Sequence, residues 1–136
     1  MSGNSKPAIE VAAGILNAAD GRVLITRRPE GKDQAGWWEF PGGKIDVNES
    51  PLEALKRELN EELGVTVETA VPFMRFLHKY PERQVTLHIF SVGRYTGDPE
   101  GCEGQQLRWE KVDALMQAGL LPADLPIVEK LLATAR

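Results

Sequence analysis

Residues 43–65 read GKIDVNESPLEALKRELNEELGV, and this stretch carries the strongest helix signals in the chain. Ser50 is a favourable N-cap residue, and Glu53, three residues later, completes a Ser-x-x-Glu capping box. Pro51 suits the first helical position, and Gly64 stands where a glycine commonly ends a helix. We therefore predict a helix that begins at Pro51 and ends just before Gly64.

One side of this predicted helix is apolar. At about 100° per residue, four leucines fall within an arc of about 80°, which we expect to face the core. These leucines are Leu52, Leu55, Leu59 and Leu63. The opposite side carries Glu53, Lys56 and Asn60, which we expect to face solvent.

Carboxylates lie immediately next to the leucines. Glu58 and Glu62 flank the apolar side directly, and Glu61 lies slightly further round the helix. Like charges four residues apart destabilise a helix, and negative charge near its C-terminal end is also unfavourable. A divalent cation would offset both effects, because converging carboxylate oxygens are what Mg²⁺ accepts. The helix pattern alone is also compatible with a solvated acidic face.

Size and composition indicate one soluble globular domain. The chain has 136 residues, of which 42% are hydrophobic and 26% charged, unlike disordered, collagen-like or coiled-coil proteins. Its longest apolar stretch, residues 11–16, is far shorter than the roughly 18 residues of a membrane span. Residues 1–7 are polar and resemble neither a secretory signal nor a transit peptide. We expect a flexible tail over residues 1–8 and a single domain over residues 9–136.

Charge and metal-binding residue types narrow the function further. A net charge of −4 provides no broad basic field for long nucleic acids. Cys102 is the only cysteine, which excludes an internal disulfide or a Cys-based zinc site and fits a reducing cytoplasm. Since the only histidines are His78 and His88, a metal ion would need oxygen ligands, which favours Mg²⁺ or Mn²⁺.

The rest of the chain mixes strands with short helices. Apolar runs and turn residues predict strands over residues 9–17, 22–28, 65–76, 85–95 and 107–111. Helices are predicted over residues 112–118 and 125–134. Because strands and helices do not alternate regularly as βαβ units, this pattern indicates an α+β sandwich.

The spacing of specific residues within 43–65 is more informative than the helix itself. Gly43, five residues, Glu49, seven residues and then Arg57-Glu58-Leu59-x-Glu61-Glu62-x-Gly64-Val65 match the Nudix box without a mismatch. At average residue usage, a chance match is on the order of 10⁻⁹ to 10⁻¹⁰ per starting point. The chain therefore resembles a Nudix hydrolase, and from about Val11 to Leu132 it is similar to the MutT type. Residues 33–36 and 122–124 also resemble the related CTP pyrophosphohydrolases.

This resemblance implies a fold and an activity. The fold would be an αβα sandwich with a central mixed β-sheet. The activity would be Mg²⁺-dependent attack of water on the β-phosphorus of a nucleoside triphosphate. The expected substrate is 8-oxo-dGTP, with 8-oxo-dGMP and pyrophosphate as products. Such an enzyme removes damaged nucleotides before DNA replication uses them, which is a DNA-repair function. The alternatives are hydrolysis of CTP or a modified dCTP, and a catalytically silent nucleotide sensor.

The resemblance also assigns metal ligands. Glu58 and Glu62 would be first-line ligands, and the Gly42 carbonyl would complete the site. Glu61 would be an additional ligand, either directly or through water. Glu103, on a glycine-flanked loop, would be a second metal ligand or the general base. Glu58 and Glu103 both stay open as the general base. Mg²⁺ is the expected cofactor, with Mn²⁺ as a substitute.

Cations next to this site are expected to have different roles. Arg57 has the wrong charge for a metal ligand, so it would pair with Glu49 or orient Glu58. Arg28 and Lys44 are candidates for phosphate contacts. Strand alternation would turn the neighbouring residue, Arg27, to the other face and into solvent.

The resemblance also implies a base pocket, and this chain departs from the family pattern at two positions of that pocket. Residues matching Glu39, Phe40, Pro41 and Gly42 line the nucleotide site in MutT relatives, and a residue at position 124 reads the base edge. The best-known pattern has asparagine where this chain has Asp124, and histidine where it has Asp33. Asp124 could instead cap the final helix. The two departures leave the base specificity open. No long nucleic acid or membrane is expected as a partner.

Overall fold

The computed structural model describes residues 8–134. The predicted tail over residues 1–8 lies outside these described residues except for Ala8, with which the first strand begins. The strands are β1 (Ala8–Leu16), β2 (Val23–Arg27), β3 (Trp38–Glu39), β4 (Gly42–Lys44), β5 (Thr66–Lys79), β6 (Gln84–Thr96) and β7 (Leu107–Glu110). The helices are α1 (Pro51–Leu63) and α2 (Leu125–Thr134), with 3₁₀ helices at Val112–Gln117 and Pro122–Asp124.

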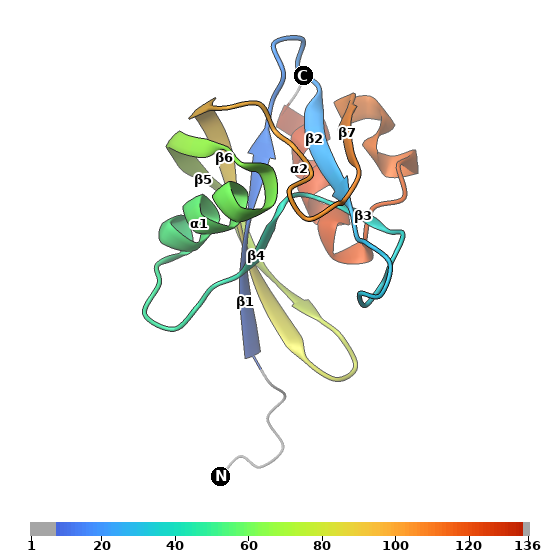
Figure 1. Cartoon of the computed structure of the whole chain (residues 1–136). Helices are drawn as coiled ribbons and strands as arrows, with labels where there is room; N and C mark the ends of the chain where they lie inside the picture. The colour runs from blue at the N-terminus through green and yellow to red at the C-terminus, as the bar shows by residue number, and fades with distance from the viewer. Residues whose placement is uncertain (1–7, 135–136) are drawn as a thin grey trace.

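The strands form two sheets. One has the order β4-β1-β6-β5, in which β1 and β6 are parallel and the other pairs are antiparallel, so it is a mixed sheet. The other is a small antiparallel sheet with the order β3-β2-β7. Figure 1 shows α1 and α2 on opposite sides of the strands.

Alternating side chains of the central strands explain this layering. On β1, Ala12 and Leu16 belong to the core cluster beneath α1, whereas Ala13 and Ile15 belong to the cluster that includes α2 residues. β2 behaves in the same way, with Leu24 on the α1 side. Both faces of the strand layer are therefore covered, and the predicted αβα sandwich with a central mixed sheet is confirmed.

Helix α1 has the boundaries that its terminal residues predict. Ser50 Oγ accepts a hydrogen bond from the Glu53 N–H, and the Glu53 carboxylate accepts one from the Ser50 N–H, so the capping box is complete. At the other end Gly64 has φ = 72°, in the left-handed region where a side chain would be strained. The residues at both ends therefore determine where this helix begins and ends.

The predicted apolar side of α1 is partly wrong. Leu55, Leu59 and Leu63 are fully buried, but Leu52 in the first turn is 36% exposed. Ala54 is fully buried although the leucine arc did not include it. The buried side is thus rotated toward Ala54, and this rotation brings Glu58 and Glu62 inward.

Other elements differ modestly from their predicted ranges. Residues 112–118, predicted as a helix, form the 3₁₀ helix Val112–Gln117. Strand β5 runs to Lys79, beyond the predicted end at residue 76, because it stays paired with β6 up to Gln84. The final helix is confirmed as predicted. None of the helices in residues 8–134 has the length and hydropathy of a membrane span.

Candidate active site

Two neighbouring cavities share one wall at the junction of the two sheets. We call the first, of about 340 Å³, the apolar cleft, and the second, of about 280 Å³, the acidic cavity. The shared wall consists of Arg28, Glu39, Gly42, Gly43 and Lys44. The apolar cleft is further lined by Ile9, Val11, Ala13, Asp33, Gln34, Phe40, Tyr80, Arg83, Val85, Leu87, Leu121, Ala123 and Asp124. The acidic cavity is further lined by Thr26, Arg27, Pro29, Lys32, Glu58, Glu62, Glu103 and Gln105.

Glu62 is the most perturbed carboxyl group of the acidic cavity. Burial, followed by the neighbouring carboxyl of Glu58 and the charges of Glu103 and Glu39, raises the pKa of Glu62 to about 9. This environment therefore disfavours the ionised form of Glu62. A bound cation would favour its ionised form.

A hydrogen-bonded loop holds Glu103 near the C-terminal end of α1. The Glu62 carbonyl oxygen accepts hydrogen bonds from the Cys102 N–H and from Gln105 Nε2, each at 3.0 Å. The Gln105 side chain also accepts from the Glu103 N–H at 2.9 Å. The last carbonyls of a helix need partners outside it, and here the loop satisfies one of them. This arrangement brings Glu103 to the same cavity as Glu58 and Glu62.

Two glycines allow strand β4 to lie beneath these carboxylates. A Cβ atom at Gly43 would collide with the Glu58 carboxylate, and one at Gly42 would collide with the backbone of Ala12. Backbone closes the space at Gly42, whereas a larger residue at Gly43 would displace the Glu58 carboxylate. Gly42 and Gly43 therefore line the acidic cavity with backbone atoms alone.

Arg57 lies at the centre of a charge network next to the acidic cavity. Its guanidinium donates to both Glu49 oxygens, at 2.6 and 3.0 Å, and to Glu58 Oε2 at 3.1 Å. It also donates to the Lys44 carbonyl at 3.0 Å. Both expected contacts of Arg57, with Glu49 and with Glu58, therefore occur together. The hydrogen bond from Arg57 lowers the pKa of Glu49.

Glu61 and Pro41 lie outside both cavities. The Glu61 carboxylate accepts from Arg57 Nη1 at 3.2 Å, and its side chain is 55% exposed. Pro41 is buried, and its carbonyl accepts from the Gly14 N–H at 2.9 Å. Within residues 8–134, no three acidic, His or Cys side chains are gathered closely enough to form a ready-made metal centre.

The wall between the cavities carries an ion pair. Arg28 Nη1 lies 3.2 and 3.3 Å from the two Glu39 oxygens, and Arg28 Nε donates to the Asp33 carbonyl at 2.6 Å. Burial raises the pKa of Glu39, and Arg28 counteracts this effect.

Arg27 also lines the acidic cavity, although strand alternation predicted the other face. That prediction is wrong because β2 ends at Arg27, so alternation does not extend to Arg28.

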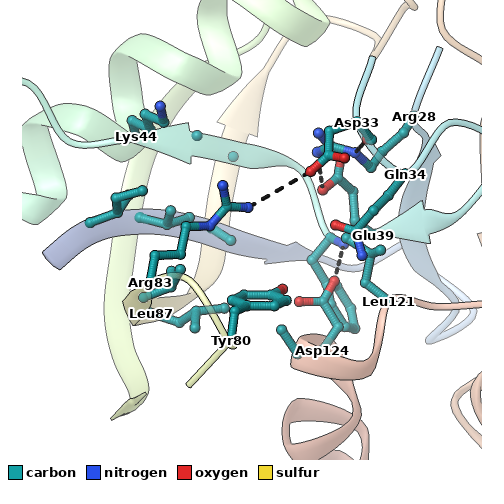
Figure 2. Close-up of a pocket in the computed structure, with 18 residues that line it drawn as sticks. Arg28, Asp33, Gln34, Glu39, Lys44, Tyr80, Arg83, Leu87, Leu121 and Asp124 are labelled. Carbon is teal, nitrogen blue, oxygen red and sulfur yellow. Dashed lines mark hydrogen bonds and ion pairs between the residues drawn. The ribbon is translucent and has the colours of Figure 1, made fainter. Parts of the chain in front are cut away.

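Asp124 is a buried acid at the back of the apolar cleft. It is 6% exposed, and its Oδ2 accepts a hydrogen bond from the Phe40 N–H at 3.0 Å. The main partner of this carboxylate is thus across the domain and not on the final helix. Burial raises the pKa of Asp124 to about 7. Figure 2 shows its other oxygen directed toward Tyr80.

The rim of the apolar cleft was not predicted from the sequence. Figure 2 shows Arg83 reaching across the cleft toward Asp33, with Nη2 at 3.9 Å from Asp33 Oδ2. The same guanidinium lies 5.2 Å from the centre of the Tyr80 ring. Tyr80 and Arg83 belong to the turn between β5 and β6. The sequence signal that could have indicated this part of the site is the presence of an aromatic residue and a cation in the same tight turn.

Comparison with known proteins agrees with this architecture. Residues 8–131 match the family model described as NUDIX domain. The 8-oxo-dGTP diphosphatase of Haemophilus influenzae is 40% identical over 127 residues, which cover 93% of each chain. The CTP pyrophosphohydrolase of Escherichia coli is 38% identical over 125 residues, which cover 92% of each chain.

A solved structure leads to the same assignment. A MutT structure from work on Aliivibrio salmonicida and Vibrio cholerae is 36% identical, with a TM-score of 0.81. The alignment covers 93% of this chain and 98% of that one. With the family model spanning most of the described residues, the chain belongs to the Nudix hydrolase family.

Proposed function

We propose that this protein hydrolyses damaged deoxynucleoside triphosphates, with 8-oxo-dGTP as substrate and 8-oxo-dGMP and pyrophosphate as products. It would act on the nucleotide pool, as a DNA-repair enzyme of the cytoplasm. The names of the relatives from Haemophilus influenzae and of several further bacterial relatives support this substrate.

The observation that carries the proposal is the pair of cavities with a common wall. A nucleoside triphosphate has an aromatic, weakly polar base at one end and about four negative charges at the other. The apolar cleft suits the base, since its floor is formed by β1 and β6 side chains and its back by Phe40 and Asp124. The acidic cavity suits the phosphates together with a cation, because Arg28 and Lys44 line it alongside the carboxylates.

Nudix hydrolases generally depend on a divalent metal ion. The donors available here are all oxygens, and the Glu62 carboxyl is desolvated next to other carboxylates, which fits a hard cation such as Mg²⁺ or, as a substitute, Mn²⁺. Glu58, Glu62 and Glu103, with the Gly42 carbonyl, would hold it. Glu61, which lies outside the acidic cavity, would take part only through a water molecule. The ion would neutralise negative charge on the phosphates and would lower the pKa of a bound water molecule.

The protein side chains then have distinct tasks in the reaction. Arg28 and Lys44 bind phosphate oxygens. A carboxylate, of Glu58 or Glu103, takes the proton of the water that attacks the β-phosphorus. The new oxygen–phosphorus bond forms as the bond to the oxygen bridging the α- and β-phosphorus breaks, which leaves the monophosphate. Arg57 orients Glu58 through the 3.1 Å hydrogen bond.

Asp124 supports a specific mode of base recognition. Guanine oxidised at C8 carries a proton on N7 that normal guanine lacks. A carboxyl group can accept a hydrogen bond from this N7–H and, when protonated, can also donate to O6. With its pKa raised to about 7 by burial, Asp124 populates both forms near neutral pH.

Hydrolysis of CTP or a modified dCTP is the second candidate. Asp124 could accept from the cytosine amino group and, when protonated, donate to N3. The 38% identity with the Escherichia coli CTP pyrophosphohydrolase favours this candidate. A catalytically silent sensor is less compatible with the site, because binding alone does not need three carboxylates around a triphosphate.

Pyrophosphate release with Mg²⁺ from 8-oxo-dGTP, dGTP, CTP, dCTP and 5-methyl-dCTP tests the proposal. We expect the highest kcat/KM for 8-oxo-dGTP. A preference for a cytosine nucleotide would replace the proposal by the second candidate, and binding without turnover of any nucleotide would support the sensor.

A further inference from the structure

Arg108 on β7 joins two segments behind the apolar cleft, although it lines neither cavity. Its guanidinium carbon lies 4.5 Å from the centre of the Trp38 ring on β3, and its Nη2 donates to the Ala118 carbonyl at 3.1 Å. Its Nε also lies 3.3 Å from Glu110 Oε2. One planar side chain thus contacts both β3 and the segment that begins at Ala118.

These two segments carry the groups at the back of the cleft. The Trp38 N–H donates to the Gly119 carbonyl and the Leu121 N–H donates to the Trp38 carbonyl, both at 2.9 Å. Further along the same pair of segments, the Phe40 N–H donates to Asp124 Oδ2 at 3.0 Å. The Arg108 contacts therefore lie at one end of a row of hydrogen bonds, and the Phe40–Asp124 contact lies at the other.

We propose that Arg108 is a positioning residue for base recognition, which sets the distance between Phe40 and Asp124 by clamping Trp38 to the Ala118 segment. Base recognition by Asp124 rests on the proposed function, whereas the clamp itself concerns only the protein. The planar guanidinium of an arginine can stack on an aromatic ring and still donate hydrogen bonds in its own plane, which a lysine ammonium cannot do, so lysine would replace it incompletely.

The clamp predicts a local effect of removing Arg108. Loss of the contacts with Trp38 and Ala118 frees one end of the row, and the Phe40–Asp124 hydrogen bond opens more often. The acidic cavity receives no contact from Arg108, so the bond-breaking step keeps its rate. Substrate affinity and base discrimination decrease instead.

Amide hydrogen exchange of the full chain tests the clamp without a substrate. In Arg108→Met we expect the Phe40 amide to exchange about tenfold faster or more, while the Leu59 amide in the core of α1 keeps its rate. Arg108→Lys should show an intermediate rate at Phe40. The matched control is Arg22→Met, because Arg22 also pairs with a carboxylate, Asp20, and its side chain has similar exposure, but it precedes β2 and has no contact with Trp38 or Ala118 among the described residues.

Steady-state kinetics with 8-oxo-dGTP provide the second measurement. We expect the KM of Arg108→Met to rise about fivefold or more, with kcat within about twofold of wild type. Unchanged exchange at Phe40, or equal acceleration at Phe40 and Leu59, would overturn the clamp. If wild type does not turn over 8-oxo-dGTP, the proposed function fails, and the exchange rates still decide the role of Arg108.

Discussion

At the residue scale, the protonation state of Asp124 decides which hydrogen bonds it can form with the base. Its burial raises the pKa to about 7, so its protonated fraction falls as pH increases through neutrality. Only the protonated form can donate to O6 of 8-oxoguanine while accepting from N7–H. We therefore predict that kcat/KM for 8-oxo-dGTP falls above about pH 7 in wild type, and that Asp124→Asn retains activity with a flatter profile. pH profiles of both proteins check this.

Removing the group should affect damaged bases selectively. Asp124→Ala should lower kcat/KM for 8-oxo-dGTP at least about tenfold, which corresponds to about 1.4 kcal/mol, the size of one good hydrogen bond. The measurement compares 8-oxo-dGTP, dGTP, dCTP and 5-methyl-dCTP across wild type, Asp124→Ala and Asp124→Asn. An equal loss on all four nucleotides after Asp124→Ala would contradict base recognition by Asp124.

The same residue predicts how stability depends on pH. The folded pKa of about 7 exceeds the ordinary value of 3.8, so the folded state binds more protons between these pH values, and stability decreases as pH rises across them. Asp124→Asn removes this dependence but keeps an acceptor for the Phe40 N–H. In urea unfolding without divalent ions, Asp124→Asn should gain stability relative to wild type from pH 4 to pH 8, at about 1.4 kcal/mol per unit of pKa difference. Parallel pH profiles would argue against a raised pKa.

At the scale of elements, α1 combines core packing and carboxylate placement. Leu59 is fully buried, so Leu59→Ala should cost about 2–5 kcal/mol of unfolding free energy. Leu52→Ala is the matched control, because Leu52 is 36% exposed, and it should change stability by about 0.5 kcal/mol or less. Urea unfolding measures both variants, and similar losses for the two would refute the observed orientation of the helix.

The loop that carries Glu103 gives a prediction about activity rather than stability. Gln105 links this loop to Glu62, so Gln105→Ala should let Glu103 move and lower kcat about tenfold or more, with little change in unfolding free energy. Gln106→Ala is the control, because the Gln106 side chain is exposed and only its carbonyl is used, by Arg27. Equal kcat values for wild type and Gln105→Ala would show that the link does not position Glu103.

Elements with local signals were predictable from the sequence. The capping box and Gly64 specify α1 from within a few residues, which is why both ends are correct. The exposure of Leu52 was not predictable from the sequence. Helical periodicity indicates which side of a helix faces the core, but not which of its turns the rest of the domain covers. Residues 112–117 form a 3₁₀ helix instead of the predicted helix. Residue propensities do not distinguish between these two helix types in a segment this short.

At the scale of the whole molecule, the site depends on contacts between distant segments. The Nudix spacing predicted Glu58 and Glu62, and the wider family resemblance predicted Glu103; all three line one cavity. No local pattern could indicate that the Phe40 N–H meets Asp124, 84 positions away, or that Arg83 reaches Asp33. Such pairs arise only when the two sheets and the β5–β6 turn come together.

The account as a whole requires that the carboxylates of the acidic cavity support phosphate chemistry. Glu62→Gln keeps the shape of the side chain and removes its charge, so the fold should persist while one proposed metal ligand is weakened. The most direct measurement is the rate of pyrophosphate release from 8-oxo-dGTP with Mg²⁺, for wild type and Glu62→Gln. We predict a fall in kcat on the order of 100-fold or more, as for the loss of one transition-state stabiliser. Turnover by Glu62→Gln at close to the wild-type rate would contradict the assignment of the acidic cavity as the catalytic centre.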